Sequence, residues 1–190
     1  MIVRLGRRTL RIPRPTASAN AIVAAGRAIA GVQDVVVTDA FVGLTFDGDS
    51  PDEIPELDLT GTAPVPREHE LVVKYDGEDL DAIAARVGVT PEEVVHLHTA
   101  PLYEVSFLGF LPGFAYLRGL DPKLVVPRRD TPRTRVPAGA VALGGPYTGV
   151  YPFASPGGWH LIGRLVSVPL WDDDGPLLAP GDRIHFREAR

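Results

Sequence analysis

Basic side chains gather between residues 118 and 135, where six basic residues stand among only two acidic ones. A guanidinium group grips a carboxylate or a phosphate through paired hydrogen bonds, so grouped arginines can form an anion site. Prolines at positions 127, 132 and 137 stiffen the backbone around this group. The pattern is equally compatible with an anion site and with solvated or interface arginines. Its members are Arg118, Lys123, Arg128, Arg129, Arg133 and Arg135.

Glycine, proline and aromatic residues recur together from residue 103 to residue 164. Such groups make specified turns that can hold side chains and backbone amides open toward a ligand or a partner. Phe107 lies on the apolar face of an expected strand and is predicted to be core. The aromatic residues beside the turns are better suited to contacts, and these are Phe114, Tyr116, Tyr151 and Trp159.

Two histidines and one serine invite catalytic interpretations that their positions weaken. His96 and His98 point about 200° apart on one helix, so they cannot chelate a metal together, and no metal site is predicted. His98 could act as an acid, a base or a donor, but a structural histidine at a helix C-terminus is favoured. Ser155 stands in Ala-Ser-Pro-Gly-Gly, which is not a nucleophile elbow, so it is expected to form a turn.

The glycine runs do not predict a nucleotide site on this chain. Glycines 144, 145, 149, 157 and 158 lack the P-loop spacing and its lysine. The segment from Gly109 to Gly113 lacks the third glycine and the following helix of a dinucleotide site. If nucleotide chemistry is involved, another protein of the same assembly is expected to supply most of it.

Composition narrows the class of protein. The chain has 190 residues, a net charge of -5 and no cysteine. The acidic balance argues against general nucleic-acid binding, and the lack of cysteine excludes disulfides and thiolate ligands. Arginines interrupt the N-terminal run, and no later segment reaches the ~20 apolar residues of a membrane span. We expect a cytoplasmic protein without a membrane or nucleic-acid partner.

The first 66 residues predict a small α+β domain. A strand over residues 2–12 is followed by a helix that Ser18 begins and Gly31 ends. Strands over 35–37 and 41–46 complete a β-α-β-β unit. Acidic residues and prolines alternate over 47–66, which predicts a linker, so we expect domains at 1–66 and 67–190.

The second domain is expected to begin with two helices and continue in strands. A strand over 71–75 precedes a helix capped by Asp79 and ended by Gly88. Thr90 and Glu93 form a capping box for the next helix, with Pro91 at its first position. Alternation at 103–107, 166–170 and 184–186, with frequent turns between, indicates a barrel or a sandwich.

The motif groups resemble the family of the 5-oxoprolinase B subunit, also described as allophanate hydrolase subunit 1 and, in one branch, as a sensor-histidine-kinase inhibitor. The resemblance rests on His98, Tyr103, Gly109-Phe110, Pro112-Gly113-Phe114, Tyr116-Leu117, Pro127-Arg128, Pro132-Arg133, Val136 to Gly139, Thr148-Gly149, Tyr151-Pro152, Ser155 to Trp159 and Leu161 to Arg164. The sequence departs from the family pattern at Tyr147, where glutamine is usual, and at Arg164-Leu165-Val166, where Arg-Thr-Pro is usual.

The resemblance implies a small α+β domain joined to a cyclophilin-like β-barrel, and a complex with the homologous 5-oxoprolinase C subunit and an A-like subunit. That complex uses ATP with Mg to open 5-oxo-L-proline into L-glutamate, and this chain alone is expected to be inactive and to bind neither cofactor. The alternatives are a kinase-inhibiting module and a carboxyltransferase-like or allophanate hydrolase-related component. Arg128, Arg133 and Arg135 are favoured for the anion, within a wider set of substrate- or partner-binding candidates: His98, Tyr103, Phe110, Phe114, Tyr116, Arg128, Arg133, Arg135, Thr148, Tyr151, Ser155 and Trp159.

Overall fold

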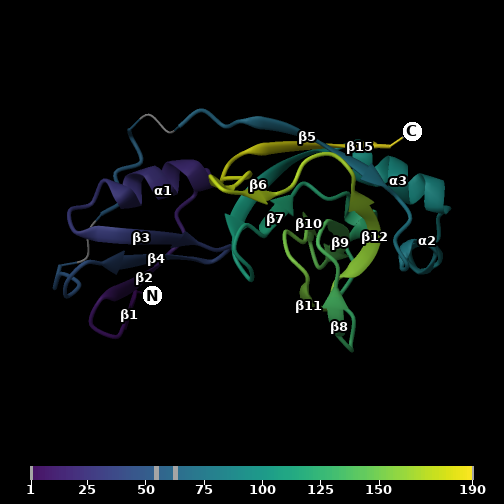
Figure 1. The fold of residues 1–190 in the computed structure, drawn as a ribbon. Coiled ribbons are helices and arrows are strands. Elements are labelled where there is room, and N and C mark those ends of the chain that lie inside the picture. The colour runs from purple at the N-terminus through teal and green to yellow at the C-terminus, as the bar shows by residue number, and fades with distance from the viewer. Residues whose placement is uncertain (1, 54–55, 62–63, 190) are drawn as a thin grey trace.

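The chain forms two lobes that lie side by side (Figure 1), and the computed structural model describes residues 2–53, 56–61 and 64–189. The α+β fold class with a C-terminal barrel is confirmed. Between residues 47 and 67 the described part contains no helix or strand, and positions 54–55 and 62–63 of the predicted linker lie outside the described residues. The domain boundary at residue 66 stays a prediction.

The N-terminal lobe is a four-stranded antiparallel sheet with one helix against it. Its sheet order is β1-β2-β4-β3, and α1 packs against β3. Residues from both layers form one hydrophobic core that includes Leu10, Ile22 and Leu44. The elements are β1 (Val3–Leu5), β2 (Thr9–Pro13), α1 (Ala19–Arg27), β3 (Val32–Val37) and β4 (Phe41–Phe46).

The C-terminal lobe is a closed barrel of seven strands in the order β10-β7-β6-β15-β5-β12-β9. Only the β15–β5 pair is parallel within it. The barrel strands are β5 (Glu68–Lys74), β6 (Leu102–Leu108), β7 (Ala115–Arg118), β9 (Ala140–Gly144), β10 (Tyr147–Val150), β12 (His160–Leu165) and β15 (Arg183–Glu188). The remaining elements are α2 (Leu80–Val87), α3 (Pro91–Thr99), the 3-10 turn η1 (Pro122–Leu124), β8 (Arg133–Val136), β11 (Ser155–Gly157), β13 (Trp171–Asp172) and β14 (Gly175–Pro176).

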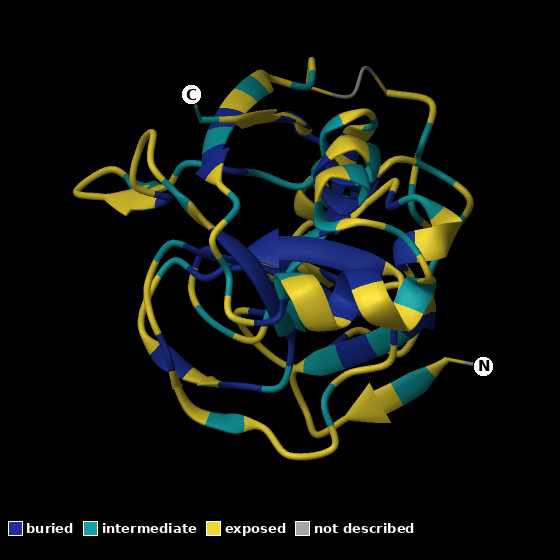
Figure 2. Cartoon of the chain, turned by 90° about the vertical axis from the view of Figure 1, so that its right-hand side faces the viewer, coloured by how far each residue is buried: buried dark blue, intermediate teal, exposed yellow. Residues whose placement is uncertain are grey.

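Strand alternation divides the barrel side chains between two clusters, because neighbouring residues point to opposite faces of a sheet. Inside the barrel lie Leu117, Val141, Leu143, Val150 and Ile162, together with residues of α2 and α3. A second cluster takes the alternate positions Tyr116, Ala142, Tyr147 and Leu161, and Val136 of β8 packs there. Since both faces are covered, every residue of β9 is buried. Figure 2 shows buried strands in the middle of the molecule. The second cluster is where the aromatic residues gather.

Local differences from the sequence predictions have simple causes. The single strand expected over 2–12 is two strands, β1 and β2, because the chain reverses at Gly6, whose φ is +73°. Residues 166–170 form no strand, since Val166 makes one ladder bond to Val72 and the chain then leaves the sheet ahead of Pro169. The alternating apolar residues of this segment lie in a loop, and of residues 166–170 only Leu170 is buried.

The predictions for the helix ends hold at some positions and not at others. The Thr90 hydroxyl accepts a hydrogen bond from the Glu93 amide at 3.2 Å, and Gly88 takes the left-handed conformation that ends α2, so the Thr90 half of the capping box and the Gly88 helix end are confirmed. Ser18 and Asp79 occupy the N-cap positions, but neither side chain makes the capping hydrogen bond. The Asp79 carboxylate is used elsewhere.

Candidate functional site

A small pocket of about 140 Å³ opens on the outer aromatic cluster of the barrel. Its volume is that of roughly five water molecules in the liquid, which suits a small ring compound. It joins six residues predicted as site residues, and these are Phe110, Phe114, Tyr116, Arg128, Tyr151 and Trp159. The other lining residues are Arg129, Pro132, Gly157 and Gly158. The glycine-aromatic motifs therefore do converge in space.

The walls of the pocket are aromatic rings packed edge to face. The Phe114 ring centroid lies 5.3 Å from that of Trp159 and 5.1 Å from that of Tyr151, with interplanar angles of 82° and 70°. Gly144 lets the indole lie against the strand, because a Cβ there would come within 2.5 Å of the Trp159 ring. Such packing fixes rigid apolar walls that can hold a flat ligand.

Phe110 stands at the edge of this pocket in an unusual backbone conformation. Its φ is +69°, and it is the only described residue other than glycine with a positive φ. The residue is 59% exposed, while its ring lies edge-on to Phe114 at 5.5 Å. A bulky residue in the left-handed region is strained, and strain of this kind concentrates at ligand and partner sites. The contact role predicted for Phe110 remains a prediction that this geometry favours.

Arg128 supplies a positive charge to the pocket. It is exposed, and among the described residues no carboxylate lies within 4.0 Å of its guanidinium. Burial raises the pKa of the neighbouring Tyr116 hydroxyl, against the opposing effect of the Arg128 charge. The tyrosine therefore stays protonated at neutral pH and can donate a hydrogen bond. Arg128 and Tyr116 together offer donors to an anion above apolar walls.

Arg133 lies in a different environment from the one expected of an anion-binding residue. Its Nη2 donates to both Asp79 oxygens at 2.8 Å, and its Nε lies 2.6 Å from Glu78 Oε1. Its Nη1 donates to the Trp159 carbonyl at 3.3 Å. Arg133 does not line the pocket, and its guanidinium is paired with carboxylates of this chain, so its role as a substrate- or partner-binding residue stays a prediction.

Asp79 is the centre of this polar cluster. It is 6% exposed and also accepts from Arg129 Nη1 at 3.0 Å and from the Leu161 amide at 2.7 Å. Burial alone would raise the pKa of this carboxyl, but hydrogen bonds from Arg133 and Leu161 and the two arginine charges outweigh it, so the pKa lies below its usual value. Asp79 is ionised at neutral pH and joins α2 to the loop that carries the arginines.

His98, Tyr103 and Thr148 lie in the barrel interior, apart from the pocket. The Thr148 hydroxyl donates its hydrogen to the Ala142 carbonyl, so the Thr148 oxygen accepts a hydrogen bond from His98 Nε2 at 2.8 Å. His98 Nδ1 then accepts from the Tyr75 hydroxyl at 2.7 Å. The Tyr103 hydroxyl donates to the His98 carbonyl at 2.8 Å. Burial lowers the pKa of His98 to about 3, so the imidazole is neutral. The favoured interpretation of His98, a structural histidine, agrees with this environment.

The last two predicted residues also lie outside the pocket lining. Arg135 is exposed on β8, and Ser155 is buried on β11 with its hydroxyl 3.1 Å from the Pro156 carbonyl. Tyr147, the departure from the family pattern, points to the N-terminal lobe, where its hydroxyl donates to Asp39 beside Arg118. The unusual residue therefore joins the two lobes.

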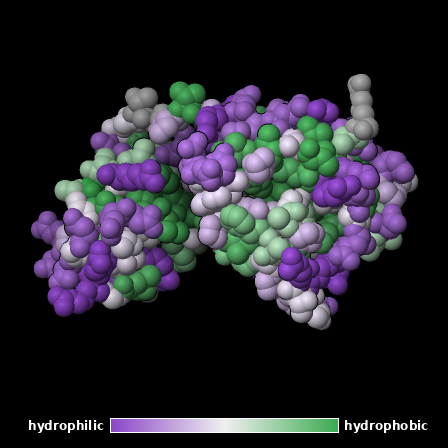
Figure 3. Space-filling model, in the orientation of Figure 1, coloured by the Kyte–Doolittle hydropathy of each residue, from purple (hydrophilic) through white to green (hydrophobic). Residues whose placement is uncertain are grey.

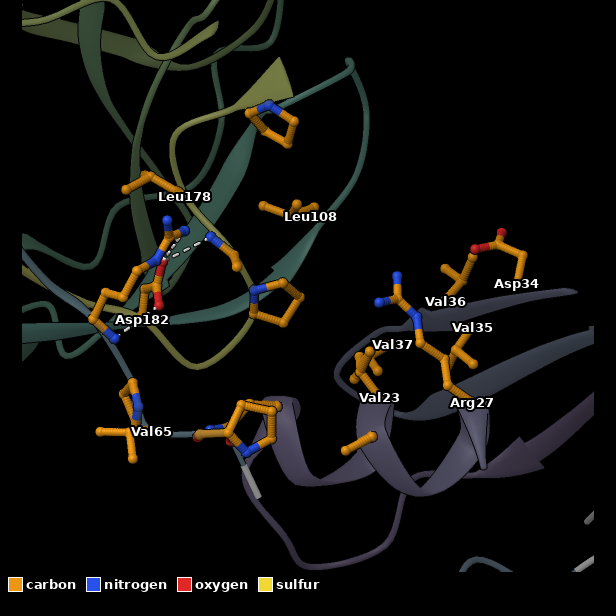
Figure 4. A pocket seen from close by; sticks show the side chains of 18 residues that line it. Val23, Arg27, Asp34, Val35, Val36, Val37, Val65, Leu108, Leu178 and Asp182 are labelled. Atoms are coloured by element: carbon orange, nitrogen blue, oxygen red, sulfur yellow. Dashed lines mark hydrogen bonds and ion pairs between the residues drawn. The ribbon is translucent and has the colours of Figure 1, made fainter. Parts of the chain in front are cut away.

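A larger cavity of about 800 Å³ lies between the lobes, lined by α1, β3, residues 64–67 and residues 176–182 (Figure 4). Hydrophobic surface is visible in the hollow between the lobes in Figure 3. The carboxylate of Asp182 in its wall already accepts from Arg67, His69 and the Ala179 amide. We place the site in the smaller pocket, because only that one combines a charged group without a carboxylate partner, among the described residues, with the predicted aromatic residues.

Sequence reasoning missed several residues of the site. The sequence predicts only helix capping for Asp79, it names Arg129 only as a member of the basic group, and it does not single out Pro132, Gly157 or Gly158 as pocket residues. The acidic run Asp76-Gly77-Glu78-Asp79 has the charge opposite to that of the basic loop, which was the available signal. Within the described ranges, no cluster of three or more potential metal-ligating side chains occurs, and no helix is long and apolar enough to cross a membrane.

Residues 13–178 match the protein family described as carboxyltransferase domain, subdomain C and D. The chain is 50% identical over 123 residues to the 5-oxoprolinase B subunit of Escherichia coli O157:H7, which covers 62% of this chain and 56% of that protein. It is 47% identical over 126 residues to the 5-oxoprolinase B subunit of Haemophilus influenzae, with 63% and 59% covered. The matched part therefore spans little more than half of each relative. These relatives confirm the resemblance that the motifs indicated.

Two solved structures are similar in fold to this chain. The crystal structure of TTHA0988 is similar with a TM-score of 0.79 and 37% identity, over 96% of this chain and 40% of that one. The Kluyveromyces lactis urea amidolyase superposes with a TM-score of 0.73 at 18% identity, over 99% of this chain and 15% of that one, which shows a shared fold.

Proposed function

This chain belongs to the family of the carboxyltransferase domain, subdomain C and D, and on that premise we propose that it is one component of an ATP-dependent 5-oxoprolinase complex, which opens 5-oxo-L-proline to L-glutamate. Its likeness to the 5-oxoprolinase B subunit of two bacteria supports the proposal. The observation that carries it is the aromatic pocket with Arg128 at its side.

The pocket suits 5-oxo-L-proline in charge and shape. The substrate has one carboxylate on a small ring that also contains a planar amide. Arg128 can pair with the carboxylate, while the rings of Phe114, Tyr151 and Trp159 form the walls against which the substrate ring packs. Because no carboxylate of the described residues competes for Arg128, its charge is free for the ligand.

The residues of this pocket do not fit ATP. At about 140 Å³ it is too small for a nucleotide, since sites for drug-sized ligands occupy roughly 300–1,000 Å³. The sequence also has no P-loop with its lysine. In this proposal ATP and Mg belong mostly to the partners, the homologous C subunit and an A-like subunit, and the assembly works in the cytoplasm. This chain contributes binding and orientation of the ring and is inactive alone.

Reconstitution tests the proposal. The purified chain is mixed with its C-like and A-like partner proteins from the same cells, and glutamate release from 5-oxo-L-proline is followed with and without ATP. We expect turnover only when all chains and ATP are present. Full activity of the partners without this chain would reject the proposal.

A further inference from the structure

Three arginines near the pocket differ in what neutralises them. Arg129 Nη1 lies 3.0 Å from Asp79 Oδ1, and Arg133 Nη2 lies 2.8 Å from the same atom. Arg133 Nε also pairs with Glu78 at 2.6 Å. Two carboxylates thus match two guanidinium groups. Within the described ranges Arg128 has no such partner, so the pocket has the charge of a single cation.

Arg129 is the arginine that this arrangement affects most. It lines the pocket beside Arg128, and its backbone amide is held by the Gly158 carbonyl at 2.8 Å. Its Nε is buried and has no hydrogen-bond partner among the described residues. The guanidinium therefore forms part of the pocket wall, yet the carboxylate behind it cancels its charge. Removing that carboxylate would leave a second positive charge at the pocket.

Asp79 is well fixed for this role. The Leu161 amide of β12 donates to its Oδ2 at 2.7 Å, and the Asp79 backbone amide donates to the Leu161 carbonyl at 2.9 Å. Asp79 is therefore tied to β12 at two points, once through its carboxylate and once through its backbone amide, and neither bond involves an arginine. Glu78 differs, because its side chain is 62% exposed and contacts only Arg133 among the described cationic groups.

We propose that Asp79 determines the anion specificity of the pocket: it pairs with Arg129 and shares Arg133 with Glu78, which leaves Arg128 as the pocket cation that selects a ring bearing one carboxylate over a doubly charged phosphate. The proposal deepens the proposed function, since it assumes that the pocket binds a ligand. A monocarboxylate needs one guanidinium fork, whereas a phosphate dianion is bound well only where several cationic donors converge.

Ligand binding to this chain tests the proposal directly. Trp171→Phe leaves Trp159 as the only tryptophan of the sequence. The NMR signal of the Trp159 indole N–H then reports on the pocket wall while the protein is titrated with benzoate or with inorganic phosphate at pH 8. We expect benzoate to bind at least about tenfold tighter than phosphate. In Asp79→Asn the ratio of benzoate affinity to phosphate affinity should fall at least about fivefold, mainly because phosphate binding improves. Glu78→Gln, the matched control, should keep the ratio within about twofold.

A second variant covers the case in which Asp79→Asn does not fold. Arg129→Gln leaves the carboxylates in excess, so phosphate should be repelled more than benzoate and the ratio should rise. A ratio that stays unchanged in folded Asp79→Asn, or in Arg129→Gln, overturns the proposal. Benzoate and phosphate are not substrates of the proposed complex, so a failed reconstitution with 5-oxo-L-proline would leave this result standing, and the reverse is also true.

Discussion

Asp79 and Arg133 are 54 positions apart in the sequence, yet Arg133 Nη2 donates to both oxygens of the Asp79 carboxylate at 2.8 Å. This pair joins the start of α2 to β8, and Arg129 joins the same carboxylate from the loop between η1 and β8. Three arginines of the basic group in the sequence thus differ in their partners: Arg129 and Arg133 pair with carboxylates of this chain, and Arg128 lines the pocket without a carboxylate partner among the described residues.

Loss of the Asp79 carboxylate should destabilise the barrel. Asp79→Ala leaves two partly buried guanidinium groups without their shared partner, and breaking a buried pair in this way costs about 3–5 kcal/mol. Urea unfolding measures the change in the free energy of unfolding. Glu78→Ala, which removes only an exposed partner of Arg133, should cost less than about 1 kcal/mol. Equal losses in the two variants would contradict the central position of Asp79.

His98 should make stability depend on pH. Its pKa is about 3 in the folded chain and near 6.5 when unfolded, so between these values the unfolded state binds one more proton. The contribution of neutral His98 to the free energy of unfolding is fully present above pH ~6.5. It is lost as the pH falls, by about 1.4 kcal/mol per pH unit below pH ~6. Urea titrations from pH 7 to pH 5 on wild type and His98→Gln check this. Parallel curves for the two proteins would show that His98 does not supply the slope.

Two adjacent glycines give a matched test of the pocket packing. A Cβ on Gly157 would overlap the Tyr151 hydroxyl, whereas one on Gly158 would meet only ordinary contacts, the nearest at 3.7 Å from Pro132. Gly157→Ala should therefore destabilise the chain by about 1–3 kcal/mol and displace Tyr151, while Gly158→Ala should change stability by less than about 1 kcal/mol. Thermal unfolding and the aromatic NMR signals report both effects. The same loss in both variants would argue against this packing.

Tyr147 should matter for the junction between the lobes. Tyr147→Phe removes the hydrogen bond to Asp39 and leaves that carboxylate with Arg118 alone, at a cost of about 1 kcal/mol. Amide hydrogen exchange at the β3–β4 turn should accelerate. Tyr103→Phe removes a comparable bond inside the barrel, to the His98 carbonyl, and should leave exchange at that turn unchanged. Exchange that does not respond to Tyr147→Phe would show that this bond does not hold the turn.

Local signals in the sequence predicted the parts of the fold that depend on local physics. The Thr90 cap, the Gly88 helix end and the turn-forming glycines beside aromatic residues could all be recognised, because each depends on a few neighbouring residues. The aromatic pocket followed from those turns. The roles of Asp79 and Arg133 could not be read in this way, since only the closed barrel brings the two residues together. The split of the first strand at Gly6 was missed because apolar residues continue on both sides of it.

The Michaelis constant for 5-oxo-L-proline in the reconstituted complex tests the central claim most directly. With Arg128→Ala in this chain, loss of a charge-assisted pair of about 1.5–3 kcal/mol should raise KM by roughly tenfold to a hundredfold. Arg135→Ala, which removes an exposed arginine outside the pocket lining, should leave KM within about twofold. A KM for Arg128→Ala equal to that of Arg135→Ala and wild type would contradict the assignment of the substrate carboxylate to Arg128.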